Sequence, residues 1–521
     1  MLYRLFGLIT GLVLLSSGAL AQTAEPTLSE RINATVAPIT DFVSEIIFWS
    51  IPIGPGIPFI VIWLLVGAIF FTLRMGFINL RGFRQALRIV SGRYDNPNDP
   101  GEVTHFQALT AALSGTVGLG NIAGVAIAIS IGGPGATLWM ILAGLFGMTS
   151  KFTECTLGLK YRRIDENGVV SGGPMYYLTR GLADRGMPGL GKVLAIMFAV
   201  LCIGGAFGAG NMFQVNQSSA QFLNVMVPLT GGEDSIFAGR GWMFGLVFAT
   251  LVGLVIIGGI RQITHVTEFL VPIMAAIYLT AASIILFVHV DQIPAAFGAI
   301  VMGAINPEAG VGGLIGVMVQ GLRRAAFSNE AGVGSAAIAH AAAKTKEPVA
   351  EGLVALLEPF VDTVVICTMT ALVIIITGMH TTAGASDGIA LTSAAFQSVF
   401  NWFPYVLSVA VVLFAFSTSI TWFYYGQRSF LFLVGDKPWA DHAELVFKSI
   451  YLMVLIIGSS MTLTAVMDFA DAMILAMGFP NMIGLYIMSG EVKRMLDSYL
   501  ERVRSGEIKP YRSQLAEQAA E

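Results

Sequence analysis

The sequence predicts an all-α polytopic membrane protein, built as two inverted repeats of five helices after one extra N-terminal span. Hydrophobic residues make up 55% of the 521 residues and charged residues 12%, which is more apolar sequence than a soluble core of this length needs. Apolar segments of about 20 residues, the length that crosses a bilayer, recur about eleven times. Two of these segments, far apart in the chain, are interrupted by glycine-rich stretches, the sequence pointer to a binding site at the bilayer midplane.

The N-terminal region precedes the repeats. Residues 1–21 carry one early arginine, an apolar run and an Ala-x-Ala end, as a cleavable secretory signal does; an uncleaved anchor helix is the alternative. Residues 22–55 are expected to be extracytoplasmic and interfacial. Residues 56–74 are long and apolar enough to form the extra span.

The remaining spans divide into a first repeat, 106–289, and a second repeat, 311–489, followed by a tail, 490–521. Because each repeat holds an odd number of spans, the two run through the membrane in opposite senses. The expected spans lie near 106–131, 136–160, 190–219, 242–260, 264–289, 311–343, 352–378, 404–428, 442–460 and 463–489.

The distribution of positive charge predicts the orientation. Lysine and arginine follow alternate spans, whereas the loops 132–135, 290–310 and 379–403 contain neither. This asymmetry places the N-terminus outside and the tail in the cytoplasm of a cell with a bacterial-type inner membrane. The formal net charge of -4 gives no indication of a nucleic-acid partner.

The first interruption runs from Ser114 to Asn121 and contains three glycines, each of which weakens a helix by about 1 kcal/mol relative to alanine. Backbone freed at membrane depth is tolerated only where it lines a cavity or is buried in protein. The half-helix starting near Asn121 offers N–H groups to a carboxylate, and the half ending near Ser114 offers carbonyls to an ammonium or Na⁺. The alternative is that 120–124 is only a GxxxG packing face. Candidate substrate residues here are Gly115, Thr116, Gly120 and Asn121.

The second interruption, 328–335, supplies two further candidate substrate residues, Phe327 and Ser328. It also contains Glu330, and an ionisable residue inside a span is a functional hypothesis by default. A salt bridge from Glu330 to Arg323 or Arg324 is the preferred interpretation, and a proton carrier is the alternative.

A helix with a hydroxyl run before an aromatic run supplies the expected sodium site. Hydroxyls of Thr418 and Ser419, with carbonyls near Gly115 and Gly118, would give Na⁺ the oxygen ligands it requires without a carboxylate. Thr418 is also a candidate substrate residue.

Trp422, four residues after Thr418, shares its helix face and would limit the cavity to small side chains; a lipid-facing or interfacial tryptophan is the alternative. Gln214 is a candidate donor to the substrate carboxylate, with interhelical hydrogen bonding as the alternative.

Other polar residues in the spans receive structural roles. Glu268, Glu358, Asp362, Asp468 and Asp471 are expected to satisfy interhelical partners. The three cysteines, Cys155, Cys202 and Cys367, lack metal-ligand spacing and are interpreted as packing residues. No nucleophile–base or metal constellation is visible, so the sequence predicts neither an enzyme nor a cofactor, with Na⁺ as the co-transported ion.

Four motifs resemble the alanine or glycine:cation symporter family, the sodium/alanine symporters. They are Gly115-Thr-Val-Gly-Leu-Gly-Asn-Ile-Ala-Gly-Val-Ala126, Gly210-Asn-Met-Phe-Gln214, Phe327-Ser-Asn-Glu-Ala-Gly-Val-Gly-Ser335 with the following Ala339-His340-Ala341, and Thr421-Trp-Phe-Tyr-Tyr-Gly426. The resemblance covers residues 56 to 495. It implies a LeuT-type fold with one additional N-terminal span, Na⁺-driven uptake of small neutral amino acids, and a cavity lined by Asn121, Gln214, Phe327, Thr418 and Trp422. Leu119 and Arg324-Ala-Ala depart from the commoner threonine and lysine-glycine-leucine of the family, which bears on side-chain selectivity.

The predicted function is a sodium-coupled symporter that imports alanine, or glycine, by alternating access. Its partners are a small zwitterionic amino acid, Na⁺ and membrane lipid, and the sequence does not predict an oligomeric state. Two other functions stay open: a proton-coupled amino-acid symporter, and a membrane receptor that binds an amino acid without moving it.

Overall fold

The computed structural model describes residues 38, 42–52, 56–305, 310–381, 388–435 and 437–511. Nearly all of the regular structure in these residues is helical, apart from two short β-hairpins. The predicted signal-like segment, 1–21, lies outside the described residues. The expected extra span is α3, Phe59–Arg74, which packs against α8, Ala136–Lys160, and α24, Gly478–Ser505.

The first predicted interruption is confirmed. A capping box starts α6, His105–Thr116, in which Thr104 and Gln107 exchange side-chain and backbone hydrogen bonds of 3.2 and 3.0 Å. The helix stops at Thr116 and resumes as a π-helical turn, η3, Gly120–Gly124, and then as α7, Val125–Gly132. The two halves are bent by 51° at this break.

The second predicted interruption is also confirmed. Helix α15, Gly310–Asn329, and helix α16, Ala336–His340, are separated by irregular backbone at 330–335. Glu330 takes a left-handed conformation with a φ of 55°, as do Gly332 and Gly334 with φ of 81° and 97°. The two glycines adopt it at little cost, whereas a residue with a Cβ does so rarely.

The other long helices overlap the expected spans, although α24 continues to Ser505, into the segment 490–521 that was expected to be a tail. They are α10, Pro188–Phe207, which continues through η4, Gly208–Met212, into α11, Phe213–Leu229; α12, Gly241–Ile256; α13, Gly259–Val288; α17, Pro348–Ala355, followed by α18, Leu357–Pro359, η7, Phe360–Cys367, and α19, Thr368–Ile376; α21, Phe403–Val434; α22, Ala440–Gly458; and α23, Leu463–Ala476, followed by α24. By length and hydropathy, 5 helices in the described residues can cross a membrane, or 6 with the bent pair, and three more apolar helices are shorter. The chain is therefore a multi-pass membrane protein, and the count of eleven spans and their pairing as five plus five stay predictions.

Several segments expected to be loops contain short elements. They are α4, Ile78–Arg81; α5, Phe83–Arg88; η2, Ile89–Arg93; a hairpin of β3, Arg163–Ile164, and β4, Val170–Ser171; α9, Pro174–Ala183; α14, Ile293–Ile305; and α20, Ile389–Gln397. A hydropathy window tuned to about 20 residues does not detect helices this short.

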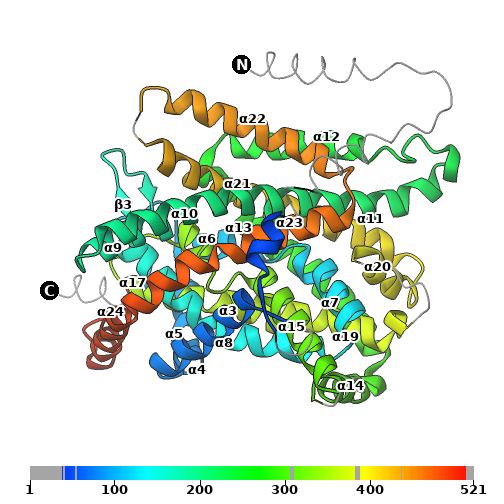
Figure 1. Cartoon of the computed structure of the whole chain (residues 1–521), viewed down its shortest axis with the longest axis horizontal. Coiled ribbons are helices and arrows are strands. Elements are labelled where there is room, and N and C mark those ends of the chain that lie inside the picture. Colours follow the sequence, from blue (N-terminus) through cyan, green and yellow to red (C-terminus); the bar gives the residue numbers. More distant parts are fainter. Residues whose placement is uncertain are drawn as a thin grey trace.

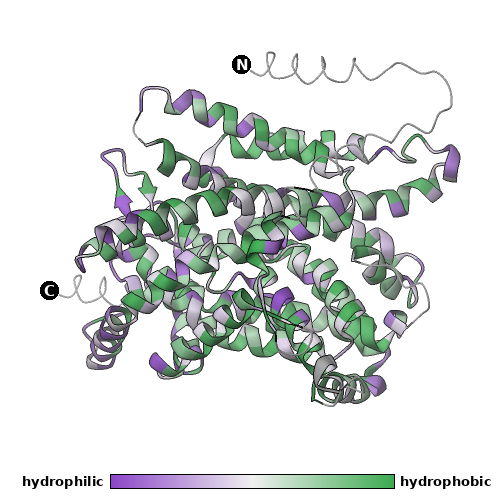
Figure 2. Cartoon of the chain, in the orientation of Figure 1, coloured by the Kyte–Doolittle hydropathy of each residue, from purple (hydrophilic) through white to green (hydrophobic). Residues whose placement is uncertain are grey.

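Helix α21 runs through the middle of the molecule and packs against α10, α11, α13 and α6 (Figure 1). Hydrophobic residues dominate the bodies of the helices, and hydrophilic residues collect at connections such as the β3–β4 hairpin (Figure 2). Large apolar side chains on the outer helices are exposed, among them Val193, Val247 and Phe287 at 63%, 62% and 81%. Such surfaces suit lipid, and the polar residues of the two breaks lie inside.

Candidate functional site

Two side chains hold the first break open. The Gly118 N–H donates to Asn121 Oδ1 at 2.8 Å, and the Leu119 N–H donates to Gln214 Oε1 at 3.1 Å. In an uninterrupted helix these N–H groups would bond the carbonyls of Ser114 and Gly115. Both carbonyls therefore lose their helical donors and become available to a ligand.

Gln214 is an interhelical hydrogen-bonding residue in this structure. Besides accepting from Leu119, it donates through Nε2 to the Ala209 carbonyl at 2.9 Å, across the π-helical turn η4. Both ends of its amide are thus occupied. Of the two interpretations of Gln214, the structure favours positioning the break over direct donation to a substrate carboxylate.

One of the expected sodium ligands, Thr418, lies beside this break. Gly118 packs so closely on α21 that a Cβ there would lie 2.5 Å from Thr418 Oγ1 and 3.1 Å from Gln214 Oε1. Thr418 Oγ1 and the neighbouring Ser419 Oγ are buried, and among the described residues neither has a hydrogen-bond partner. Buried hydroxyls are normally paired. An unpaired hydroxyl oxygen next to a break with freed carbonyls is a candidate ligand for a hard monovalent cation.

The two breaks touch each other. A Cβ on Gly120 would lie 3.4 Å from Ser328 Cα and 3.5 Å from the Phe327 ring, whereas a Cβ on Gly124 would meet nothing within 4 Å. The glycine pair at 120 and 124 is therefore not simply a helix-packing face, since only one of the two is in close contact. Phe327 also packs edge-on against Phe213, with ring centroids 5.1 Å apart.

Asp362, on η7, joins the two breaks through one carboxylate. It accepts hydrogen bonds from Asn121 Nδ2 at 2.5 Å, from Ser328 Oγ at 2.9 Å and from Thr363 Oγ1 at 2.7 Å. The prediction that this residue satisfies interhelical partners is confirmed. Its partners are the predicted site residues, however, so Asp362 belongs to the site, and an acidic residue within an apolar span was the signal for it.

Trp422 lies inside the protein. It is 1% exposed, and its Nε1–H donates to Glu330 Oε1 at 3.1 Å. Its ring is so close to α10 that a Cβ on Gly205 would lie 3.1 Å from it. The structure therefore excludes a lipid-facing tryptophan.

The predicted salt bridge of Glu330 is wrong. Arg323 and Arg324 both pair with Asp471 on α23, Arg323 at 2.8 Å. Glu330 instead accepts from Ser335 Oγ and Trp422 Nε1. Because α15 ends at Asn329 and Glu330 turns into the left-handed region, its carboxylate leaves the helix face that the arginines share.

The remaining candidates are helix residues at the edge of the break. Thr116 Oγ1 donates to the Ala112 carbonyl of its own helix at 3.3 Å. A Cβ on Gly115 would lie 3.2 Å from both Thr421 Cγ2 and the Tyr425 ring, which shows how closely α6 and α21 pack. Apart from the glycines, which have no side chain, all the candidate site residues have buried side chains. A solute reaches this site only if helices move.

A family model decides the classification of the chain. The model of the sodium:alanine symporter family matches residues 40–513. The chain belongs to the sodium:alanine symporter family. As a member of this family it is an amino-acid transporter of the symport type that spans the membrane.

Relatives within the sodium:alanine symporter family cover most of the chain. The sodium/alanine symporter AgcS of Methanococcus maripaludis is 39% identical over 455 residues, which are 87% of this chain and 96% of that protein. The probable sodium/glutamine symporter GlnT of Bacillus subtilis is 34% identical over 453 residues, 86% and 89% of the two chains. Among solved structures, MhsT in complex with L-phenylalanine matches with a TM-score of 0.47 and 14% identity, over 74% of this chain and 98% of that one.

Proposed function

We propose that this family member is a sodium-coupled symporter that imports small neutral amino acids, alanine first or glycine, across the plasma membrane. The observation that carries the proposal is the buried hydroxyl of Thr418 beside the first break, which has no hydrogen-bond partner among the described residues, as is also the case for Ser419 on the same helix. Leaving a buried polar group without a partner costs about 1–3 kcal/mol. An ion that binds there recovers this cost, which gives the protein a reason to keep the arrangement.

The substrate occupies the junction of the two breaks in this proposal. Carbonyls at the end of α6 accept from its ammonium group, and the N-terminal side of the half-helix at Asn121 attracts its carboxylate. The rings of Phe327 and Trp422 limit the space that is open to the side chain of the amino acid, which favours substrates with small side chains. Na⁺ binds the freed carbonyl of Gly115 and the hydroxyls of Thr418 and Ser419, together with the Gly118 carbonyl, which also accepts from the Asn121 N–H at 3.2 Å.

Coupling follows from the shared break. Na⁺ at Thr418 orders the same backbone that holds the amino acid, so each ligand raises the affinity for the other by the same factor. A membrane potential contributes about 2.3 kcal/mol per charge per 100 mV to the uptake of the ion. We propose further that the helices form two inverted repeats of five. The connections rich in lysine and arginine, 75–104, 161–187, 344–347 and 435–439 together with the segment after 489, are here called the basic face, and we propose that this face lies in the cytoplasm.

Uptake into proteoliposomes tests the proposal. Labelled alanine should accumulate under an inward Na⁺ gradient and stop when choline replaces sodium at fixed pH. Uptake that continues in choline would favour proton coupling through Glu330, and binding without accumulation would favour a receptor. Since one relative is named a glutamine symporter, the competition panel should include unlabelled glutamine beside alanine and glycine.

The site assignment has its own test. Replacing Asn121 removes the side chain that joins Gly118 to Asp362, and replacing Trp422 removes the partner of Glu330. Asn121→Ala and Trp422→Ala are therefore expected to impair alanine uptake. Unchanged uptake in both variants would rule out the assigned site.

A further inference from the structure

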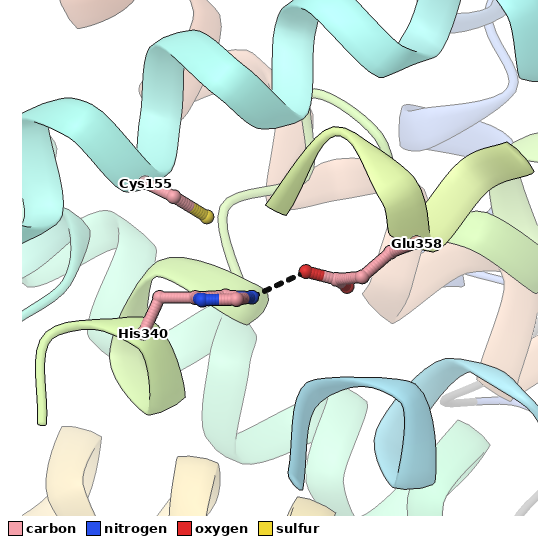
Figure 3. A group of neighbouring side chains, drawn as sticks. All are labelled: Cys155, His340 and Glu358. Carbon is pink, nitrogen blue, oxygen red and sulfur yellow. Dashed lines mark hydrogen bonds and ion pairs between the residues drawn. The ribbon is translucent and has the colours of Figure 1, made fainter. Parts of the chain in front are cut away.

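A second buried polar cluster borders the second break, where Asn481 Nδ2 donates both to Glu154 Oε2 at 3.0 Å and to the Gly332 carbonyl at 2.8 Å. It contains Cys155 of α8, His340 of α16 and Glu358 of α18 (Figure 3). His340 Nε2 lies 2.5 Å from Glu358 Oε1, and His340 Nδ1 lies 2.5 Å from Glu351 Oε1. All three side chains of this contact are fully buried.

Counting hydrogens shows that this contact needs an additional proton. A neutral imidazole has one N–H, and an ionised carboxylate has none. Two hydrogen bonds from one ring to two carboxylates require either an imidazolium or a protonated glutamic acid. The cluster therefore holds one proton more than a neutral histidine and two carboxylates would supply.

A row of titratable side chains leads from this contact toward the surface, and its last step, between His105 and Asp95, is longer than a hydrogen bond. The second oxygen of Glu351 bonds His105 Nδ1, and His105 Nε2 lies 4.0 Å from Asp95 Oδ1. The Asp95 side chain is 29% exposed, in the connection that precedes α6. Burial raises the pKa of the Asp95 carboxyl, and the charge of His105 opposes this shift. Carboxylates and imidazoles thus alternate from solvent on the basic face to His340.

The opposite end of the route is closed by charge. Lys151 Nζ lies 3.3 Å from Glu358 Oε2 and 3.9 Å from Glu154 Oε1. An ammonium group repels an excess proton, so a proton on Glu358 does not continue past Lys151 toward Glu330. The titratable and charged groups that face the His340 contact, directly or through its partners, are Asp95, His105, Lys151, Glu154, Cys155, Arg162, Glu330, Glu351 and Glu358.

A metal ion fits this cluster less well than a proton. Cys155, His340 and Glu358 do bring a ligand atom each within 4.8 Å of one another. Both ring nitrogens of His340 are already bonded to carboxylates, however, and Lys151 already supplies a positive charge beside Glu358. A divalent cation would have to displace these contacts and approach the ammonium.

We propose that His340 and Glu358 form a proton-binding site that exchanges with the basic face through Asp95, His105 and Glu351. The proton holds the outer ends of α6 and α16 against α17 and α18, because His105 begins α6, His340 ends α16, and the two glutamates lie on α17 and α18. Loss of the proton leaves one ring nitrogen facing a carboxylate without a hydrogen between them, and that contact opens. The outer ends of both broken helices are then released from α17 and α18. The proton leaves as it entered and does not cross the membrane with the substrate.

Thermal unfolding of the purified full-length protein, without Na⁺ or amino acid, tests the site. The folded chain holds a proton that the unfolded chain releases, so the unfolding temperature of the wild type should fall as pH rises from about 7 to 9. Glu358→Gln supplies an amide N–H to His340 Nε2 and needs no extra proton, so its slope should be smaller by about one proton. His340→Gln should reduce the slope in the same way, which keeps the test valid if one variant folds poorly.

Glu444→Gln is the matched control, because Glu444 pairs with Lys448 at 2.6 Å with a side chain 27% exposed and lies outside the cluster. Its slope should equal that of the wild type. The proposal is overturned if Glu358→Gln and His340→Gln both keep the wild-type slope.

A pH-sensitive dye sealed inside proteoliposomes tests the one-sided exchange. Alanine uptake is expected to leave the luminal pH unchanged. Luminal acidification that follows uptake and disappears in Glu358→Gln would overturn it. This inference goes beyond the proposed function, since loss of sodium dependence would refute the symport proposal and leave the unfolding result unaffected.

Discussion

Thr418 and Thr421 lie three residues apart on α21, and both are buried. Thr421 Oγ1 donates to Ser114 Oγ at 2.9 Å, whereas Thr418 Oγ1 has no partner among the described residues. The threonine at 421 thus has a structural hydrogen bond, whereas the hydroxyl oxygen of the threonine at 418 has no partner among the described residues. This contrast allows a ligand role to be separated from a packing role.

Thr418→Val should weaken sodium binding without harming the fold. Valine keeps the shape and removes a hydroxyl that has no hydrogen-bond partner among the described residues, so the unfolding temperature without Na⁺ should stay equal or rise. The Na⁺ concentration for half-maximal alanine uptake should rise about tenfold, which corresponds to about 1.4 kcal/mol. Thr421→Val is the control: it should lower the unfolding temperature and keep the sodium requirement. An unchanged requirement in Thr418→Val would contradict the assigned sodium site.

Trp422→Phe should impair transport although the ring remains aromatic. The substitution removes the N–H that donates to Glu330 Oε1 at 3.1 Å, and a buried hydrogen bond to a charged acceptor is worth about 1.5–3 kcal/mol. Initial alanine uptake should fall about tenfold or more. Trp439→Phe, at a tryptophan that is 50% exposed, should transport normally. Equal rates for both variants would show that the bond to Glu330 has no role in transport.

At the scale of elements, the broken helix α6–η3–α7 is defined by what its glycines touch. A Cβ on Gly118 would collide with Thr418 and approach Gln214 closely. A Cβ on Gly124, six residues later, would meet no other atom within 4 Å among the described residues. Both belong to one short segment, but only Gly118 lies where the ion and substrate are proposed to bind.

Gly118→Ala should therefore abolish alanine uptake, because the added methyl group would lie 2.5 Å from Thr418 Oγ1. Gly124→Ala should retain uptake. Its backbone is helical, with φ of -63°, so alanine should stabilise the fold by about 0.4–1 kcal/mol through the unfolded state. Uptake and unfolding temperature measured on both variants decide the matter; a fully active Gly118→Ala would remove the first break from the site.

At the scale of the whole molecule, the orientation in the membrane depends on the distribution of charge rather than on any single contact. The β3–β4 hairpin lies on the basic face, and the connection between α11 and α12 lies in a stretch with little positive charge. The positive-inside rule places the first in the cytoplasm and the second outside.

Cysteine labelling checks this orientation. The native cysteines are all buried, so a membrane-impermeant maleimide should react little with the wild type. Asp234→Cys, at an exposed residue, should be labelled in intact cells. Glu166→Cys, exposed on the hairpin, should be labelled only after permeabilisation. The reverse pattern would invert the proposed topology.

Particular residues show how far the sequence reached. The glycines at 115–120 and 332–334 located both breaks, because glycine weakens a helix whatever surrounds it. The hydroxyl run and the following aromatic run indicated a site-facing helix, and the spacing of four residues put Thr418 and Trp422 on one face of it. The sequence did not predict contacts between residues that are far apart in the chain. Asp362, on a third helix, bonds Asn121 and Ser328, and Glu330 bonds Trp422 instead of the expected arginines.

By itself, then, the sequence determined that the chain is a membrane protein, where its long helices lie and where two of them break, since these follow from local hydropathy and backbone preference. Only the tertiary structure decided which polar groups are paired. Asp471 pairs with Arg323 and Arg324, and Thr418 and Ser419 have no hydrogen-bond partner among the described residues. Glu351 joins His105 to His340, and His340 in turn bonds Glu358. Pairing of polar groups depends on distances between helices that are far apart in the chain. Because these groups are buried, leaving one of them without a partner costs free energy.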